Sequence, residues 1–362
     1  MDPRIRQHAE IIADHSIDLQ KGDNVMILAP PVAEDLVVAL HEVIGDRGAN
    51  PIYLNISERA ERAYLNAHDG DFDTPTHRQA LVEEADAYVR INARENVSEQ
   101  SDVDSETLSA FSQALQPILT ERLNKRWCAT QFPSSGYAQL AEMSTEAYEN
   151  FVWDAVTKDW DEQRAFQQNL VEILNPADEV RIESGDETDI VMSIDGMRAL
   201  NDYGEKNLPG GEVFTAPVPD SVEGTVRFDM PLYHRGRVIE GAFLHFEDGT
   251  VVDHEAEKNE DLLTRVLDTD DGARRLGELG IGMNRDIDQF SYNMLFDEKM
   301  GDTVHLAIGL AYDECVGEGQ EGNESAVHLD MIVDMSEDAR ITVDGETIQR
   351  NGTFRFEDGF DG

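Results

Sequence analysis

The second half of the chain carries carboxylates and histidines in short segments that are otherwise apolar or rich in glycine. Glu212 lies in NLPGGEVFTAP, Glu278 in RRLGELGIGMN and His305 in FDEKMGDTVHLAIG, while His328 and Asp330 lie two residues apart in NESAVHLDMIVDM. Two imidazoles and three carboxylates are typical ligands of Zn²⁺, Co²⁺ or Mn²⁺. A closed structural zinc site takes four ligands, whereas a pair of metals about 3.5–4 Å apart can use all five. The residues therefore predict a two-metal hydrolase.

In a chain with 75 acidic residues, most carboxylates are expected to be solvated surface groups. Glu212 departs from that expectation because it follows Pro-Gly-Gly and precedes Val213 and Phe214. Glu278 lies between leucines, and a buried carboxylate requires a cation. A lone core histidine is more often satisfied by a hydrogen bond than by a metal. Asp330, however, shares a strand face with His328, which makes the two a plausible pair of ligands.

The remaining histidines lie in hairpins, polar loops or helix faces, and we do not expect them to bind metal. They are His8, His15, His41, His68, His77, His234, His245 and His254.

The first part of the chain predicts an α/β domain with a parallel sheet. A helix is expected over residues 4–20, and a strand–helix–strand unit follows over 24–31, 32–48 and 49–57. Residues 86–93 are expected to add a third strand, and residues 105–174 are expected to be mostly helical. The first strand-to-helix turn contains neither GxGxxG nor GK[ST], so the sequence does not support nucleotide binding there.

The pattern changes after Asn175-Pro176, where short strands and turns replace helices. We therefore expect an N-terminal domain over 1–176 and an α+β, mainly antiparallel C-terminal domain over 177–362 that holds the metals. Helices are predicted over 259–268 and 270–278. Strands are predicted over 179–185, 189–196, 224–233, 237–249, 251–257, 304–310 and 327–335, followed by a hairpin over 339–354 with Asp344-Gly345 as its turn.

Composition restricts the environment and the partners of the protein. The 362 residues carry a formal net charge of −46, and only six of the 29 basic residues are lysine. Such a surface is typical of a protein that works in molar salt, and it lacks the basic footprint that nucleic acid or an anionic membrane requires. Cys128 and Cys315 are expected to be buried and unpaired. The sequence shows no signal peptide and no apolar run of 18 residues, which predicts a soluble, cytoplasmic protein.

The segments around Glu212, Glu278, His305 and His328, together with Tyr312, closely resemble the thermophilic-type metalloaminopeptidases represented by aminopeptidase T, AmpS and PepS. The resemblance extends over essentially the whole chain. It implies that Glu212, Glu278, His305, His328 and Asp330 are metal ligands and that Tyr312 lies in or beside the coordination shell. It also implies two divalent metals, removal of N-terminal residues from peptides and a homodimer.

Two metals would activate a water and polarise the scissile carbonyl, with Mg²⁺ as a further possible ion. We expect Glu278 to bridge the metals and Tyr312 to donate a hydrogen bond to the oxyanion, which makes these two the catalytic residues. A free α-amine on the substrate would define an exopeptidase. Two alternatives remain: another dimetal amidohydrolase, such as a dipeptidase or deacylase, and a binding protein that uses its metals structurally.

The net charge predicts that stability and activity rise steeply from low salt into the molar range. Folding brings carboxylates together, and their repulsion is screened over about 10 Å at 0.1 M salt but over about 3 Å at 1 M. Melting temperatures across a KCl series test this prediction, with divalent metal held constant because a few bound ions cannot screen a whole surface. A flat series would mean that local ion pairs already balance the surface.

Overall fold

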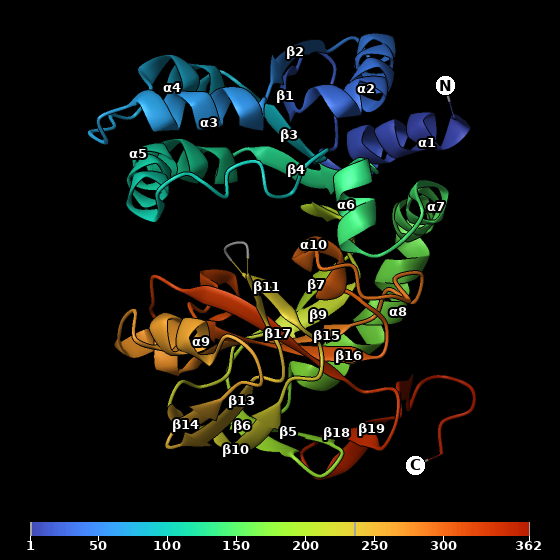
Figure 1. Cartoon of the computed structure of the whole chain (residues 1–362). Coiled ribbons are helices and arrows are strands. Elements are labelled where there is room, and N and C mark those ends of the chain that lie inside the picture. The colour runs from blue at the N-terminus through green and yellow to red at the C-terminus, as the bar shows by residue number, and fades with distance from the viewer. Residues whose placement is uncertain (1, 235–236, 362) are drawn as a thin grey trace. The chain divides into compact units, whose positions relative to one another are not determined.

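The structure, a computed structural model, describes residues 2–234 and 237–361 and contains two compact units (Figure 1). The first unit runs to Lys158 and also includes Gly204–Gly210, whereas the second comprises Asp159–Tyr203 and the chain from Gly211 onward. The first unit thus ends earlier than the boundary after residue 176 that the sequence suggests. The division into folding domains at 176 and 177 stays a prediction.

The first unit is built on a five-stranded parallel sheet in the order β2-β1-β3-β4-β8, which confirms the expected α/β fold. Its strands are β1 (Asn24–Ala29), β2 (Asn50–Asn55), β3 (Ala87–Asn92), β4 (Arg126–Gln131) and β8 (Asn207–Leu208). Its helices are α1 (Pro3–Ile11), α2 (Glu34–Asp46), α3 (Glu58–Ala67), α4 (Thr76–Glu83), α5 (Ser105–Leu123), α6 (Ser135–Leu140) and α7 (Thr145–Val156).

Strand β4 lies inside the region that the sequence analysis expected to be mostly helical. Its segment, RWCATQ, has no long apolar run because Thr130 and Gln131 are polar, yet both are fully buried. They remain satisfied because Thr130 hydrogen-bonds His8 over 2.8 Å and Gln131 contacts the Tyr148 hydroxyl. Buried polar residues therefore hid this strand from the sequence pattern.

The second unit packs two antiparallel sheets around one core, which confirms the expected C-terminal architecture. The larger sheet has the order β14-β13-β10-β6-β5-β18-β19-β20, and the smaller one, which carries the candidate site, has the order β17-β16-β15-β9-β7. The smaller sheet contains β7 (Leu200–Asp202), β9 (Glu212–Thr215), β15 (Leu276–Gly282), β16 (Thr303–Gly309) and β17 (His328–Asp334).

The larger sheet contains β5 (Glu179–Ser184), β6 (Thr188–Ser193), β10 (Glu223–Arg227), β13 (Phe243–Glu247), β14 (Thr250–Glu255), β18 (Ala339–Val343), β19 (Glu346–Arg350) and β20 (Thr353–Phe354). A separate ribbon pairs β11 (Leu232–His234) with β12 (Arg237–Ile239). The helices of this unit are α8 (Trp160–Leu174), α9 (Glu260–Leu267) and α10 (Met294–Asp297).

Every second residue of the smaller sheet points into the shared core, and this alternation leaves the opposite face for the site. The core residues include Val213, Leu279, Ile281, Val304, Leu306, Leu329 and Met331 from the smaller sheet, with Val180, Ile182, Ile190 and Met192 from the larger one. Helices α8 and α9 contribute Leu170, Leu174, Leu263 and Leu267 to the same cluster.

Two predictions about local structure in this unit are wrong. The helix expected over 270–278 is a short 3₁₀ turn at Asp271–Arg274 followed by β15, so Glu278 lies on a strand. All seven residues of β15 are buried, which removes the polar alternation that usually marks a strand. The strands expected over 224–233 and 237–249 each divide into two, at 228–231 and 240–242.

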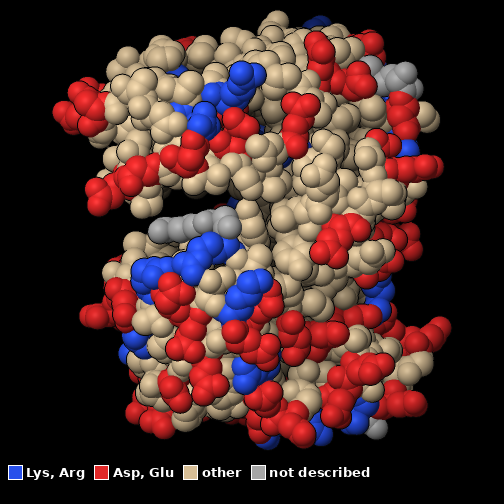
Figure 2. Space-filling model, viewed as in Figure 1, with Lys and Arg blue, Asp and Glu red and all other residues tan. Residues whose placement is uncertain are grey.

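Acidic side chains are spread over the visible face of both units and do not gather in one patch (Figure 2). Many surface arginines are paired with them, as Arg181 is with Asp189 and Arg340 with Glu183. Both cysteines are buried, as expected. Within the described residues, no helix has the length and apolar character that a membrane span requires.

Candidate metal centre

The smaller sheet brings all five predicted ligands to one face. Glu212 begins β9, Glu278 lies in β15, His305 in β16, and His328 and Asp330 lie in β17. These strands are hydrogen-bonded neighbours in the order β9-β15-β16-β17. Segments separated by more than a hundred residues therefore meet because the topology places their strands side by side.

Small residues at the cross-strand positions paired with the predicted ligands leave room for the ligand side chains to reach neighbouring strands. Gly280 pairs with His305, and Ala307 lies between Glu278 and Asp330 in the strand register. A Cβ atom on Gly280 would overlap the imidazole of His305. Glycine is thus required at position 280 because the β15 backbone passes directly beneath this ring.

A second glycine fixes the approach to Glu212. Gly211 has a φ of +124°, and a Cβ atom there would overlap the side chain of Asn284. Its carbonyl accepts a 2.7 Å hydrogen bond from the Met283 amide at the end of β15. The close backbone approach that Gly211 allows therefore places Glu212 against the neighbouring strand.

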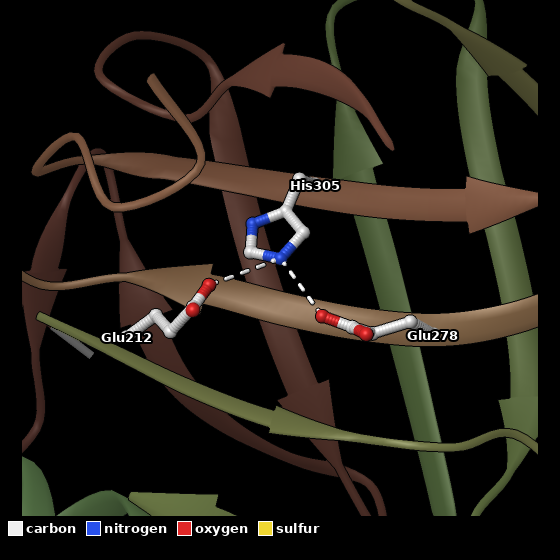
Figure 3. Close-up of side chains that lie close together, drawn as sticks. All are labelled: Glu212, Glu278 and His305. Carbon is white, nitrogen blue, oxygen red and sulfur yellow. Dashed lines mark hydrogen bonds and ion pairs between the residues drawn. The ribbon is translucent and has the colours of Figure 1, made fainter. Parts of the chain in front are cut away.

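The ligands form two groups that share Glu278. In the first group, His305 Nε2 lies 3.2 Å from Glu212 Oε2 and 3.2 Å from Glu278 Oε1, with the ring pointing between the two carboxylates (Figure 3). In the second group, His328 Nε2 lies 3.6 Å from Glu278 Oε2 and 3.5 Å from Asp330 Oδ1. The two oxygens of Glu278 thus face different histidines, which is the arrangement expected of a bridging carboxylate.

These side chains fit a divalent cation. Glu212, Glu278 and His305 are at most 5% exposed, and Glu212 Oε2, Glu278 Oε2 and His305 Nδ1 form no hydrogen bond within the described structure. A buried carboxylate oxygen without a donor is costly unless a cation compensates it. Oxygen and imidazole nitrogen donors without thiolate suit Zn²⁺, Co²⁺ or Mn²⁺.

A backbone hydrogen bond orients the second histidine. His328 Nδ1 lies 2.9 Å from the carbonyl oxygen of Leu310, so this nitrogen carries the proton and donates it. The other nitrogen, Nε2, then faces Glu278 and Asp330, where it can offer its lone pair to a cation that displaces its proton. Such a partner behind a ligating imidazole fixes the tautomer and the ring orientation.

The carboxylates raise the pKa of both histidines. Burial disfavours the protonated form of His305, but hydrogen bonding to Glu278 and the charges of Glu212 and Glu278 outweigh it and raise the pKa to about 9. Burial of His328 is likewise outweighed, chiefly by Asp330, and its pKa rises to about 10. Burial itself raises the pKa of Glu278. The cluster thus holds protons tightly when no metal competes for them.

Tyr312 lies beside the second group. Its ring centroid is 4.8 Å from that of His328 and 6.2 Å from that of Phe214, and the residue is 44% exposed. Burial of the hydroxyl and the nearby carboxylates raise its pKa, so the phenol keeps its proton. Whether Tyr312 also ligates a metal stays a prediction.

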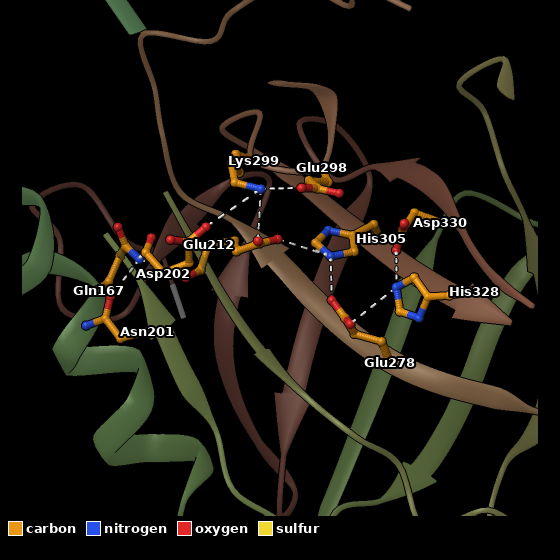
Figure 4. A network of polar contacts seen from close by, with 10 residues as sticks. All are labelled: Gln167, Asn201, Asp202, Glu212, Glu278, Glu298, Lys299, His305, His328 and Asp330. Atoms are coloured by element: carbon orange, nitrogen blue, oxygen red, sulfur yellow. Dashed lines mark hydrogen bonds and ion pairs between the residues drawn. The ribbon is translucent and has the colours of Figure 1, made fainter. Parts of the chain in front are cut away.

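Sequence reasoning missed the charged residues behind Glu212. The side chain of Lys299 is 0% exposed, and its Nζ lies 3.0 Å from Glu212 Oε1, 3.7 Å from Asp202 Oδ2 and in close contact with Glu298 (Figure 4). The available signal was a Glu-Lys pair inside FDEKMGDTVHLAIG, in a chain with six lysines. An isolated lysine of this kind is ordinarily a surface residue, so the pattern alone did not reveal it.

A side chain of helix α8, Gln167, hydrogen-bonds the main chain of Glu212. Gln167 is fully buried and donates from Nε2 to the carbonyl oxygens of Glu212, at 2.8 Å, and Asp202, at 3.0 Å (Figure 4). The same nitrogen lies 2.8 Å from Asn201 Oδ1. The edge strand β7 and its neighbour β9 are therefore held against α8 at the position of Glu212, the first predicted ligand.

Comparison with known proteins identifies the family to which the chain belongs. The model of the family described as thermophilic metalloprotease (M29) matches residues 1–359. Aminopeptidase 2 of Geobacillus stearothermophilus is 29% identical over 98% of both chains, and Aminopeptidase T of Thermus thermophilus is 43% identical over 38% of this chain and 36% of its own. The solved structure of wild-type AmpT from Thermus thermophilus superposes with a TM-score of 0.87 at 27% identity, covering 98% of this chain and 99% of that one. The family expected from the sequence is thus confirmed.

For protein freed of metal, we expect the melting temperature to fall as the pH rises from about 6.5 to about 9. The pKa values of His305 and His328 are raised to about 9 and about 10, so the folded state retains protons that the unfolded chain releases near 6.5. This stabilisation is complete below the unfolded pKa and is lost as the pH passes the folded values. Melting curves at fixed molar KCl test it, and a metal-free melting temperature that stays level or rises over this range contradicts it.

Proposed function

We propose that this chain, which belongs to the thermophilic metalloprotease family (M29), removes N-terminal residues from peptides with the help of two divalent metal ions. It is a hydrolase of the metalloaminopeptidase class, as the family and its named aminopeptidase relatives establish. We propose three further properties: the number of metals, the residues that bind them and the requirement for a free N-terminus on the substrate.

One observation carries the two-metal proposal: Glu278 directs its two oxygens at two different histidines. Glu212, Glu278 and His305 would hold one ion, and Glu278, His328 and Asp330 would hold the other. A carboxylate shared in this way is the usual bridge between paired catalytic metals.

The charges around the site support the same number of ions. Five largely buried carboxylates and one ammonium, all connected in the network of Figure 4, leave four negative charges, which two divalent cations balance. Burial raises the pKa of Glu298 to about 8 even with the Lys299 ammonium beside it, and bound cations would lower that pKa toward ionisation. The groups counted are Asp202, Glu212, Glu278, Glu298, Asp330 and Lys299.

The donor set suits Zn²⁺, Co²⁺ or Mn²⁺, and Mg²⁺ remains possible. When bound, such ions supply a Lewis acid for the scissile carbonyl and a nucleophile at neutral pH. The Tyr312 hydroxyl, which keeps its proton, can donate a hydrogen bond to the oxyanion that forms on the substrate. The carbonyl of Leu310 keeps His328 Nε2 directed at the site during this chemistry.

The substrates we propose are peptides with a free N-terminus. A homodimer, a halophilic surface, a cytoplasmic location and the absence of nucleic-acid or membrane partners remain predictions from the sequence and from the family resemblance.

Chelation should abolish hydrolysis of aminoacyl-p-nitroanilides, because the bound metals are the proposed source of the activated water. Adding back Zn²⁺, Co²⁺ or Mn²⁺ should restore it. Elemental analysis of the stripped and reloaded protein measures the number of ions per chain. N-acetylated substrates should be inert; rapid cleavage of them supports the deacylase alternative. Full turnover in a metal-free sample excludes the proposal, and loss of fold on chelation at pH 7 supports structural metals instead.

Two substitutions separate the roles within the site. Glu278→Gln should lower kcat by orders of magnitude and reduce metal content, since one amide cannot bridge two cations. Tyr312→Phe should lower kcat roughly 10²–10³-fold at unchanged metal content if the phenol is one oxyanion donor. Glu247→Gln and Tyr64→Phe, on exposed parts of β13 and α3, are matched controls and should leave both quantities unchanged. If Tyr312→Phe halves the bound metal, the phenol is a ligand.

A further inference from the structure

Lys299 is out of place in a chain of this composition. All six lysines belong to the described residues, and Lys299 alone has no exposed side-chain surface. A lysine is rarely buried without an ionic partner, because its ammonium must leave water. Here three carboxylates compensate it, and one of them, Glu212, belongs to the first ligand group.

Because of the contact with Lys299, the two carboxylate oxygens of Glu212 have different partners. Oε1 accepts from the ammonium at 3.0 Å, whereas Oε2 lies 3.2 Å from His305 Nε2. A carboxylate without such a partner could rotate, present both oxygens to one cation or turn away from it. With Oε1 engaged, only Oε2 faces the space between His305 and Glu278 (Figure 4).

The loop that carries Lys299 is itself fixed. The Lys299 amide donates to the Phe296 carbonyl at 3.0 Å, and the Lys299 carbonyl accepts from Asn284 at 3.0 Å, next to the end of β15. Asp297, which is 1% exposed, accepts hydrogen bonds from the amide and the hydroxyl of Ser291 at 2.8 and 2.7 Å. The ammonium is thus presented by a rigid turn, which is the requirement for orienting another side chain.

We propose that Lys299 is a positioning residue that fixes Glu212 as a single-oxygen ligand of the metal held with Glu278 and His305. This inference rests on the proposed two-metal function. It assigns Lys299 a positioning effect on one ion of the pair and not on the ion held by His328 and Asp330. Within the described residues the ion pairs of Lys299 are with Asp202, Glu212 and Glu298, and none is with His328 or Asp330.

The test is Lys299→Met, which keeps the length and removes the ammonium, with Co²⁺ as the probe. Titration of the stripped protein should show one of the two ions binding about 10–100-fold more weakly, the usual cost of losing a residue that orients a ligand. The visible absorption of that ion should change, while the other ion keeps its affinity and spectrum. A purely electrostatic role predicts the opposite sign, since loss of a nearby positive charge favours cation binding.

Tighter or unchanged binding of both ions, with an unchanged Co²⁺ spectrum, overturns the proposal. Lys258→Met, at an exposed lysine paired with Glu240, is the matched control and should match the wild type. Wild-type protein that binds fewer than two Co²⁺ ions refutes the two-metal function itself, whereas two ions with unchanged behaviour in Lys299→Met refute only the role of Lys299.

If Lys299→Met does not fold, Lys299→Arg and Lys299→Gln are compared in the same titration. Arginine keeps a charged donor for Glu212, whereas glutamine keeps only a neutral one, so the first ion should bind more tightly to the arginine variant. Tighter binding to the glutamine variant indicates charge repulsion without positioning and overturns the proposal.

Discussion

The site depends on several carboxylates that lie close together and are buried by the fold, away from water. Glu212, Glu278 and Asp330 lie on one face of a small sheet, and two of them are 5% exposed. Carboxylates so close together are stable only where positive charge lies among them. The structure supplies that charge in two forms, the buried ammonium of Lys299 and the protons that the histidines bind with raised pKa values, and the proposed divalent cations would supply the rest.

An antiparallel sheet suits this task because its register fixes lateral spacing while one face remains free for chemistry. The apolar face of β15, β16 and β17 enters the core with the larger sheet, which anchors the candidate ligands on these strands to the hydrophobic core of the unit. Glycine and alanine at the paired positions then give the imidazoles room to turn toward the carboxylates. Substitution of an apolar residue on the core face or of a small residue on the site face would therefore change the same quantity, the spacing between the imidazoles and the carboxylates.

The sequence indicated the candidate ligands because each interrupts an apolar or glycine-rich segment, where a charged side chain needs a partner; the assignment of these residues as ligands stays a prediction. The sequence did not reveal Lys299 or Asp202, since a lysine or an aspartate among other charged residues looks like a surface group until the chain is folded. The parallel strand β4 was hidden by Thr130 and Gln131, whose burial depends on His8 and Tyr148 in other elements. β15 was partly misread as helix because a strand buried on both faces shows no alternation. Local patterns thus show which residues are unusual, whereas partners contributed by distant segments require the tertiary structure.

The acidic residues of this protein fall into two physical classes. Those on the surface are hydrated, partly paired with arginine and open to screening, so mobile ions can relieve their repulsion. The buried carboxylates at the candidate site, such as Glu212 and Glu278, are not accessible to mobile salt ions, so only groups bound in the structure can balance their charge. An increase in salt therefore cannot replace Lys299 or the metals, and bound metals cannot replace salt at the surface. Stability in salt and metal binding are consequently separate properties, set by different carboxylates of the same chain.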